Sequence, residues 1–446
     1  MSDIPVLILH GWSDTSASFK PLANFLRNNG RQVIDIWLAD YVSMHDEVTI
    51  YDLGNAMGRA IREQKIPESK HSFDVIIHST GALVVRQYLL QYFYGKPDQC
   101  PIQHLVMLAP ANFGSPLASA GQSVTGRFFK GWKWDGMFQT GKKVLDALKL
   151  ASPITFRMAE RDLFNPENPL FKPEHIFTTI LVGSEAYTNP MRAVLHENGS
   201  DGTVRVATAN LNASMLKVIF SNAPDAEPEK ITVAPQYDPI AFCVAEGHNH
   251  GSITKPESAN FPELGGLILK SLDIATPSEY RSHVDMLRTL TENLYNQTHP
   301  GKKSEWYHQY QHIVTCAKDQ FGAEIGDYMI EFFEEADKSD RIMVKLHSEV
   351  LEEVTLFEPG SGYRSFFFDL TDLKREILDN GHQVDMSISA AAVSERIKYV
   401  DPKKYITVAG PAPDQQALLK PHTPLLVDFQ LPRIEGKKKV FTLTKA

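Results

Sequence analysis

The stretch of residues 74–85 constrains the fold of this chain more than any other part of its sequence. The apolar run Val75-Ile76-Ile77 ends in His78-Ser79-Thr80-Gly81 and passes at once into a helix-like pattern of apolar residues. A strand that stops on a serine and turns sharply into a helix holds the serine hydroxyl at the tip of a tight, exposed turn. The next backbone N–H and the helix N-terminus then point to where an oxyanion develops during acyl transfer. The stretch therefore predicts a nucleophile elbow at Ser79, and an ordinary buried turn between strand and helix is the alternative.

The residues that flank Ser79 bear on how tight this turn can be. Strand and helix backbones pass close to each other at such an elbow, and Gly81 and Ala82 supply the small side chains required on the helix side. On the strand side, Ile77 stands where the usual Gly-x-Ser-x-Gly pattern has a glycine. The sequence thus departs from the pattern at one position.

A second segment with the same chemistry opens the chain. The apolar run Ile4–Leu9 leads into His10-Gly11-Trp12, which predicts a strand followed by a loop. We expect the backbone amide of Trp12 to be one oxyanion donor and the amide of Thr80 to be the other; the alternative is a plain glycine turn. A predicted strand over 32–38 and a predicted helix over 50–64 separate this loop from Ser79, as a doubly wound parallel sheet requires.

A serine hydroxyl needs a base, and the base needs an acid that orients it. His250 follows the apolar run Ile240–Ala245, and Asp201 lies in a turn-rich loop after the apolar run Ile176–Gly183. All three residues therefore follow the carboxyl ends of predicted strands, where ligand sites of open α/β sheets form. His248 is the alternative base. With His250 it could form half of a metal site, but no further ligands with convincing spacing accompany the pair, so we expect no metal.

Together these motifs resemble a known family. The segments His10-Gly11-Trp12, His78-Ser79-Thr80-Gly81, 198–204, Asn249-His250-Gly251 and 109–116 are similar to those of the α/β-hydrolase superfamily, and within it of the bacterial lipases. The resemblance covers roughly residues 1–275. It implies that Ser79 is the nucleophile, His250 the general base and Asp201 its partner, with the amides of Trp12 and Thr80 holding the oxyanion. It implies no metal and no organic cofactor.

Residues 116–173 interrupt the rhythm of strands and helices. This insertion contains Phe128, Phe129, Trp132 and Trp134 among several glycines, followed by a helix-like segment around 144–150. We interpret it as a cap or lid whose aromatic side chains line an acyl pocket. The alternative is that these aromatics only pack the insertion onto the core.

The character of the sequence changes after residue 275. Thr276-Pro277-Ser278-Glu279 is a capping box that predicts the start of a helix. We expect a second helical segment over 306–316, and hence a helical connector over 276–326. From residue 327 onward the pattern predicts short strands of an antiparallel sandwich, at 328–333, 342–347, 363–369, 384–389, 405–408, 425–431 and 440–443.

The role of this β-rich region, residues 327–446, is open between a lipid- or substrate-docking module, a dimerisation surface and a scaffold for the hydrolase and its lid. Asp337, Asp340 and Asp369 suggest loop calcium, but solvated acidic turns are the preferred interpretation.

Composition limits the classes of partner. With 43% hydrophobic and 22% charged residues the chain is of ordinary globular composition, and its net charge of −9 argues against nucleic acid and offers no polybasic patch for anionic membranes. Cys100, Cys243 and Cys316 are expected to be free, buried thiols. No secretory signal is visible in the opening residues, so we expect none, and no run approaches the ~18 apolar residues of a spanning helix. We therefore expect a cytoplasmic protein, with signal-independent export as the alternative.

These observations lead to one functional expectation and two alternatives. We expect a serine carboxylic ester hydrolase of the lipase or esterase type, acting on an ester or lipid substrate and contacting lipid aggregates or membranes peripherally. A phospholipase that acts as an exported, membrane-attacking effector is the first alternative. A catalytically silent hydrolase fold that serves as an interaction module is the second. Acyl-chain preference, head group and oligomeric state do not follow from the sequence.

Overall fold

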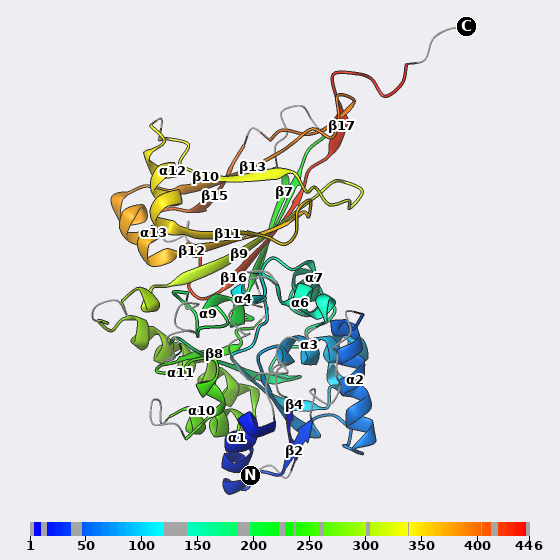
Figure 1. The fold of residues 1–446 in the computed structure, drawn as a ribbon, viewed down its shortest axis with the longest axis vertical. Coiled ribbons are helices and arrows are strands. Elements are labelled where there is room, and N and C mark those ends of the chain that lie inside the picture. The colour runs from blue at the N-terminus through cyan, green and yellow to red at the C-terminus, as the bar shows by residue number, and fades with distance from the viewer. Residues whose placement is uncertain are drawn as a thin grey trace. The chain divides into compact units, whose positions relative to one another are not determined.

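The structure of the chain is a computed structural model, and it describes residues 4–9, 16–36, 47–119, 141–185, 187, 197–222, 228–235, 238–257, 263–299, 304–337, 339–402, 404–411 and 418–442. The chain forms two compact units (Figure 1). The first contains residues 1–212 and 236–308, and the second contains residues 213–235 and 309–446.

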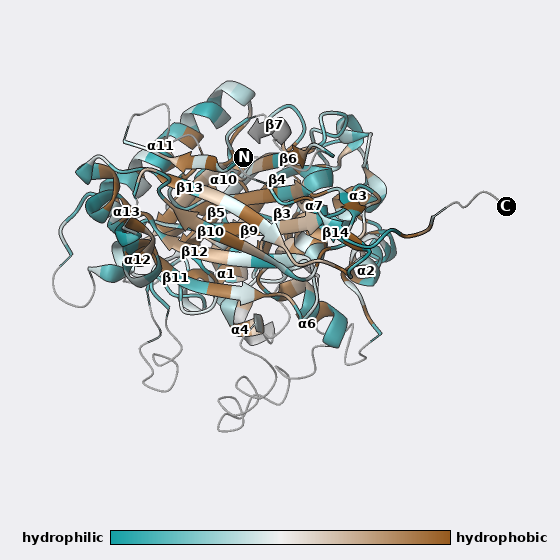
Figure 2. Cartoon of the chain, turned by 90° about the horizontal axis from the view of Figure 1, so that it is seen from above, coloured by the Kyte–Doolittle hydropathy of each residue, from teal (hydrophilic) through white to brown (hydrophobic). Residues whose placement is uncertain are grey.

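The first unit is built on a six-stranded sheet in which every neighbouring pair is parallel. In spatial order the strands are β2 (Val33–Ile36), β1 (Val6–Leu9), β3 (Phe73–His78), β4 (Ile102–Leu108), β5 (Phe177–Gly183) and β8 (Ala241–Ala245). The strands β1, β3, β5 and β8 are buried along their whole length, as expected for a parallel sheet that is covered on both faces. Figure 2 shows the strands coloured mainly as hydrophobic and the helices in both colours.

Helices cover both faces of this sheet. One face packs against α1 (Ser16–Asn28), α10 (Leu264–Leu272) and α11 (Pro277–Tyr295), which share a core with alternate strand residues such as Ile76 and Leu181. The remaining helices of the unit are α2 (Ile50–Glu63), α3 (Gly81–Tyr92), α4 (Pro116–Ser119), α6 (Lys142–Leu148), α7 (Pro153–Asp162) and the short α9 (Val206–Ala209). The predicted doubly wound α/β sheet is confirmed.

The second unit consists mainly of two sheets that share one core. The larger sheet has the order β11 (Leu351–Leu356), β12 (Tyr363–Asp369), β9 (Tyr310–Lys318), β16 (Pro424–Gln430), β6 (Ser214–Phe220) and β7 (Pro228–Pro235). The smaller sheet has the order β10 (Tyr328–Phe333), β13 (Val384–Ala390) and β15 (Ile406–Ala409), and a separate ribbon pairs β14 (Ile397–Tyr399) with β17 (Arg433–Glu435). Residues of both sheets, among them Phe332, Phe366 and Phe429, meet in one hydrophobic cluster. The predicted β-rich C-terminal region with antiparallel sheets is confirmed. Within the larger sheet, however, β16 runs parallel to both of its neighbours.

Three predicted elements are wrong. The segment expected to be helical over 306–316 is mostly the strand β9, which is buried at all but its last residue. A continuous buried run carries no period, and for that reason such a strand cannot be told from a buried helix by pattern. The strand expected at 342–347 is instead α12 (Arg341–Lys345) followed by one turn of π-helix. The third is the strand expected at 440–443: its described residues, 440–442, form no strand.

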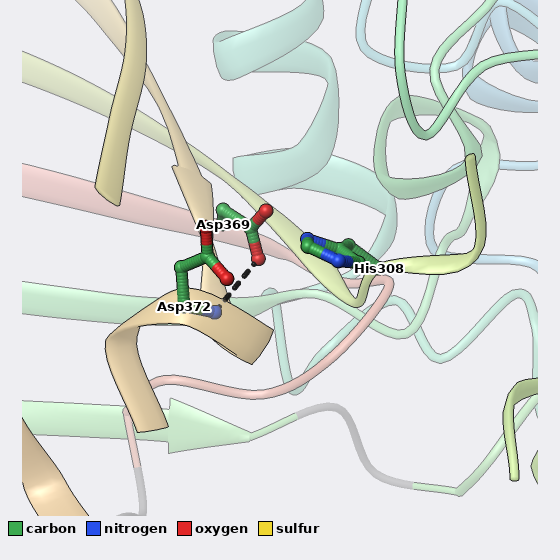
Figure 3. A group of neighbouring side chains, drawn as sticks. All are labelled: His308, Asp369 and Asp372. Carbon is green, nitrogen blue, oxygen red and sulfur yellow. Dashed lines mark hydrogen bonds between the residues drawn. The ribbon is translucent and has the colours of Figure 1, made fainter. Parts of the chain in front are cut away.

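Side chains that cap helix N-termini are present at Thr276 and at Asp369. The predicted capping box is present at α11, where the Thr276 side chain accepts from the Glu279 amide and the Glu279 carboxylate accepts from the Thr276 amide. Asp369, one of the acidic turn residues, caps α13 (Leu370–Glu376) by accepting from the amides of Thr371 and Asp372 (Figure 3). One oxygen of its carboxylate, Oδ1, thus caps the helix N-terminus.

The sequence also makes predictions about the cysteines and about the apolar character of the helices. Cys100, Cys243 and Cys316 are free and buried, as predicted, and burial raises the pKa of each thiol to about 12. Among the described residues, no helix combines the length and the apolar character needed to cross a bilayer.

Candidate active site

The turn between β3 and α3 has the geometry of a nucleophile elbow. β3 ends at His78, α3 begins at Gly81, and Ser79 between them has a φ of 55°. This left-handed conformation reverses the chain within one residue, and the Ser79 amide donates to the Leu108 carbonyl of β4 at 3.1 Å. Ile77, the departure from the usual pattern, is buried in β3 with 1% exposed surface. A large side chain at this position is therefore compatible with the turn.

His250 is carried by the loop that follows β8. Its backbone amide donates to the carbonyl of Asp201 at 2.9 Å, which joins the two loops directly. The carbonyl of His248 accepts from the amides of Ser184 and Glu185, both at 3.0 Å, so the loop also rests on the end of β5. At Gly183, an added Cβ would lie 2.1 Å from that same carbonyl oxygen. The close approach of the loop to β5 therefore requires glycine.

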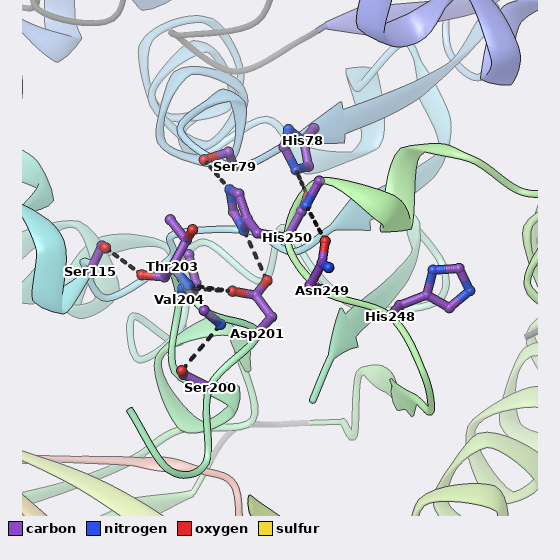
Figure 4. Close-up of polar contacts among 12 residues, drawn as sticks. His78, Ser79, Ser115, Ser200, Asp201, Thr203, Val204, His248, Asn249 and His250 are labelled. Atoms are coloured by element: carbon purple, nitrogen blue, oxygen red, sulfur yellow. Dashed lines mark hydrogen bonds and ion pairs between the residues drawn. The ribbon is translucent and has the colours of Figure 1, made fainter. Parts of the chain in front are cut away.

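Ser79, His250 and Asp201 form one hydrogen-bonded row (Figure 4). The Nε2 atom of His250 lies 3.0 Å from Oγ of Ser79, and its Nδ1 atom lies 2.8 Å from Oδ2 of Asp201. Asp201 is fully buried, and His250 exposes only 7% of its surface. This order of hydroxyl, imidazole and carboxylate is the one that activates a serine as a nucleophile.

The other oxygen of Asp201 fixes the carboxylate. Its Oδ1 atom accepts from the amides of Thr203 at 3.0 Å and Val204 at 2.7 Å. The Thr203 carbonyl in turn accepts from the Ser115 hydroxyl at 2.5 Å (Figure 4). With both oxygens engaged, the carboxylate has one orientation, and it presents Oδ2 to the imidazole.

Two further histidines, His248 and His78, lie near this row. His248, the alternative base, turns its ring away from Ser79 (Figure 4), and its Nδ1 lies 3.2 Å from Oγ of Ser252. His78, which sequence reasoning did not single out, lies beneath the row: its Nε2 is 2.9 Å from the His250 carbonyl oxygen and the two rings are 4.5 Å apart. Because a carbonyl oxygen only accepts, Nε2 of His78 must carry the proton. The available signal was its position as the last strand residue before the serine.

Of the remaining predicted site residues, the structure describes only Thr80. Thr80 is buried and precedes the first turn of α3, so its amide belongs to the positive end of that helix. Trp12 lies outside the described residues. The same holds for the four aromatics of the insertion, Phe128, Phe129, Trp132 and Trp134. The second oxyanion donor and the acyl pocket therefore stay predictions.

A buried ion pair joins α3, the helix that follows Ser79, to α7. Arg86 of α3 donates to both oxygens of Asp162 in α7, at 2.8 and 3.1 Å, and both side chains are fully buried. Arg86 also donates to the Asn112 carbonyl at 2.9 Å. The pair thus ties α3 to the loop after β4. Removal of one partner would strand a buried charge, at a cost of about 3–5 kcal/mol.

No protein-family model matches this sequence, and no curated protein matches it either. Solved structures do match. Phospholipase PlaB from Legionella pneumophila, in complex with thio-NAD, aligns with a TM-score of 0.81 at 24% sequence identity, over 99% of this chain and 97% of PlaB. A second structure of PlaB aligns with a TM-score of 0.78 at 23% identity, over 96% and 94% of the two chains. The similarity shows that both units of this chain have counterparts in one known fold.

Proposed function

Because this chain has the α/β-hydrolase fold, we propose that it is a serine carboxylic ester hydrolase that cleaves lipid or acyl esters. The observation that carries the proposal is the row in which His250 bridges Ser79 and Asp201 at 3.0 and 2.8 Å. Such a row performs acyl transfer without a metal or an organic cofactor.

The mechanism follows from the chemistry of the three side chains. Ser79 attacks the ester carbonyl while Nε2 of His250 takes the hydroxyl proton. The negative charge that develops on the carbonyl oxygen is stabilised by the Thr80 amide and the N-terminus of α3, with the Trp12 amide as the expected second donor. His250 then protonates the departing alcohol. Water, deprotonated by the same imidazole, attacks the acyl-enzyme and releases the acid.

Asp201 has a supporting role in this scheme. Its Oδ2 accepts from Nδ1 of His250, which leaves Nε2 unprotonated and directed at Ser79. The carboxylate also stabilises the imidazolium that forms as the proton moves. Burial of Asp201 strengthens both effects, because the surroundings screen the carboxylate less than water would.

A phospholipid is the more specific candidate substrate. PlaB is a phospholipase, and its similarity to this chain spans the second unit as well as the catalytic one. A lipase or esterase without a head-group requirement is the broader form of the same proposal.

The test is hydrolysis of p-nitrophenyl esters from acetate to palmitate and of phosphatidylcholine vesicles, with Ser79→Ala beside the unaltered protein. We expect Ser79→Ala to lower kcat by at least ~10⁴-fold, because the nucleophile is lost. Ser282→Ala, at an exposed position of α11, is the matched control and should keep full activity. Release of lysophospholipid and fatty acid, followed by mass spectrometry, identifies a phospholipase.

Two results would contradict the proposal. Hydrolysis that persists in Ser79→Ala means that another group performs the chemistry. A folded protein that is inactive on every ester and on phospholipid fits a silent fold that acts as an interaction module.

A further inference from the structure

The ribbon of β14 and β17 forms the centre of a basic surface in the second unit. We define the basic arm as residues 393–399 and 433–441. Its two segments pair antiparallel through β14 and β17, and two further bonds extend the pairing: the Gly436 amide donates to the Arg396 carbonyl at 2.7 Å, and the Lys438 amide donates to the Glu395 carbonyl at 3.0 Å. The Arg396 guanidinium donates to the Lys439 carbonyl. The arm is therefore a hydrogen-bonded structure as far as residue 439.

The arm is fixed to the unit by its apolar residues. Tyr399 and Ile434 pack against the core cluster that the two sheets share. At Gly436, an added Cβ would lie 2.3 Å from the Glu395 carbonyl oxygen, so the two segments approach as closely as only glycine permits. The inner residues thus anchor the arm, while most of its charged side chains lie at the surface. Lys438 forms an exposed ion pair with Glu395, and the Arg433 guanidinium lies 3.6 Å from the Asp319 carboxylate.

The charge of the arm is opposite to that of the chain. It holds six basic and two acidic side chains, a local net charge of +4, within a chain of net charge −9. Except for the partly buried Arg433, these side chains are exposed: Glu395, Arg396, Lys398, Glu435, Lys437, Lys438 and Lys439. The overall composition concealed this cluster. Four of its basic residues, Arg433 and Lys437–Lys439, lie within one short segment, and the fold adds Arg396 and Lys398 from the other. The expectation of no polybasic patch is therefore wrong for this part of the chain.

Exposed apolar side chains accompany the charges. Val393, Val440 and Phe441 expose 53%, 47% and 74% of their surfaces, and in Figure 2 the segment that runs toward the C-terminus changes from hydrophilic to hydrophobic colour. A further aromatic, Phe321, is 79% exposed on a turn that contacts the arm: the side chain of its neighbour Gln320 accepts from the Arg433 amide at 2.7 Å. Water is a poor solvent for such a group of side chains.

We propose that the basic arm docks this protein on the surface of an anionic phospholipid bilayer. Lysine and arginine side chains are attracted to anionic head groups, and each contributes roughly fivefold to the partition coefficient. Phe441 and Val440 enter the interface beside them, which supplies the second signal that stable peripheral binding requires. Nucleic acid would satisfy the lysines but would leave these apolar side chains without a partner. A lipid surface satisfies both kinds of side chain.

The experiment measures co-sedimentation of the full chain with phosphatidylcholine vesicles, prepared with or without phosphatidylglycerol. All proteins carry Ser79→Ala, so that binding is measured without hydrolysis and a failure of the proposed function does not affect the result. One variant replaces Lys437, Lys438 and Lys439 by Gln, and a second is Phe441→Ser. The matched control replaces three exposed lysines elsewhere, Lys20, Lys96 and Lys374, by Gln and thus makes the same change in net charge.

We expect binding only to the vesicles that contain phosphatidylglycerol, and we expect added salt to weaken it. The arm triple variant should bind about 100-fold more weakly, from roughly fivefold for each lysine, while the control triple variant binds normally. Phe441→Ser should weaken binding at every salt concentration. Equal loss in the two triple variants, or no binding by the parent protein, would overturn the proposal. Lysine-dependent binding to duplex DNA without binding to vesicles would overturn it in favour of a nucleic-acid partner.

Discussion

Ser79 has a backbone conformation that is unfavourable for a residue with a side chain. A φ of 55° costs a non-glycine residue on the order of 1 kcal/mol or more. Hydrogen bonds on either side compensate: the Ser79 amide donates to Leu108, and its carbonyl accepts from Ala82 and Ala111, both at 3.2 Å. Hydrogen bonds to the sheet and to α3 thus offset the cost of this backbone conformation. They keep the Ser79 hydroxyl within hydrogen-bonding distance of His250.

At the same scale, His78 is expected to position His250 through one hydrogen bond. His78→Leu removes the donor to the His250 carbonyl while keeping an apolar side chain in the buried site. Loss of one such bond is worth about 1 kcal/mol, so we expect kcat on a soluble ester to fall roughly fivefold with KM little changed.

The control for His78 is a substitution that retains a donor. His78→Gln keeps an N–H group that reaches the same carbonyl, and it should recover most of the lost kcat. If Leu and Gln lower kcat equally while both variants fold normally, the hydrogen bond does not position His250.

At the scale of elements, the end of β5 supports the loop that carries His250. Gly183→Ala places a methyl group against the His248 carbonyl, where the ideal Cβ is only 2.1 Å from the oxygen. The loop must shift, and a displacement near 1 Å at a catalytic group costs up to about 100-fold in rate. We expect kcat to fall by this order in steady-state ester hydrolysis, with a lower melting temperature.

Gly266→Ala is the matched glycine control. Gly266 lies at an exposed position of α10, and an added Cβ there meets no atom within 4 Å. Alanine favours the helix by up to about 1 kcal/mol over glycine, so stability should rise or stay the same and activity should not change. Equal activity of the two alanine variants would show that the loop tolerates the methyl group.

How far the sequence predicts the site and the fold depends on whether the signal is local. Ser79, Asp201 and His250 each follow an apolar strand, and strand ends of a parallel sheet converge on one edge. The short strands β14 and β17 had no such signal, because three residues that mix charged and apolar side chains are too few to show a period. The placement of β6 and β7 in the second unit depends on pairing with β16, which lies some 200 residues later in the chain. No local pattern contains that information.

At the scale of the whole molecule, buried histidines make both units sensitive to acid. Burial lowers the pKa of His283 in the first unit to about 4 and that of His422 in the second to about 3. Both values lie below the ordinary 6.5 of an unfolded chain, so protonation favours the unfolded state. Stability is full above pH 6.5 and declines as the pH falls toward 4. For His283 the loss is on the order of 3 kcal/mol.

Thermal unfolding at a series of pH values tests this expectation. His283→Gln should be less stable than the unaltered protein at pH 7.5, and the difference should shrink as the pH falls from 6.5 to 4. His347→Gln, at an exposed position, should follow the unaltered protein throughout. A constant gap for His283→Gln across that range would exclude His283 as a source of the acid sensitivity.

The pairing of β16 with β6 on one side and β9 on the other also governs how the chain is made. Residues 213–235 leave the ribosome long before β9 and β16, and until β16 is made, β6 has β7 on one side and no neighbour on the other. The second unit can therefore be completed only after synthesis has passed residue 430, whereas the central strands of the first unit are all available much earlier. For the same reason, a fragment that stops near residue 275 would retain a hairpin whose edge has lost its partner strand, a template for aggregation. A separable catalytic unit would require excision of residues 213–235 as well as truncation.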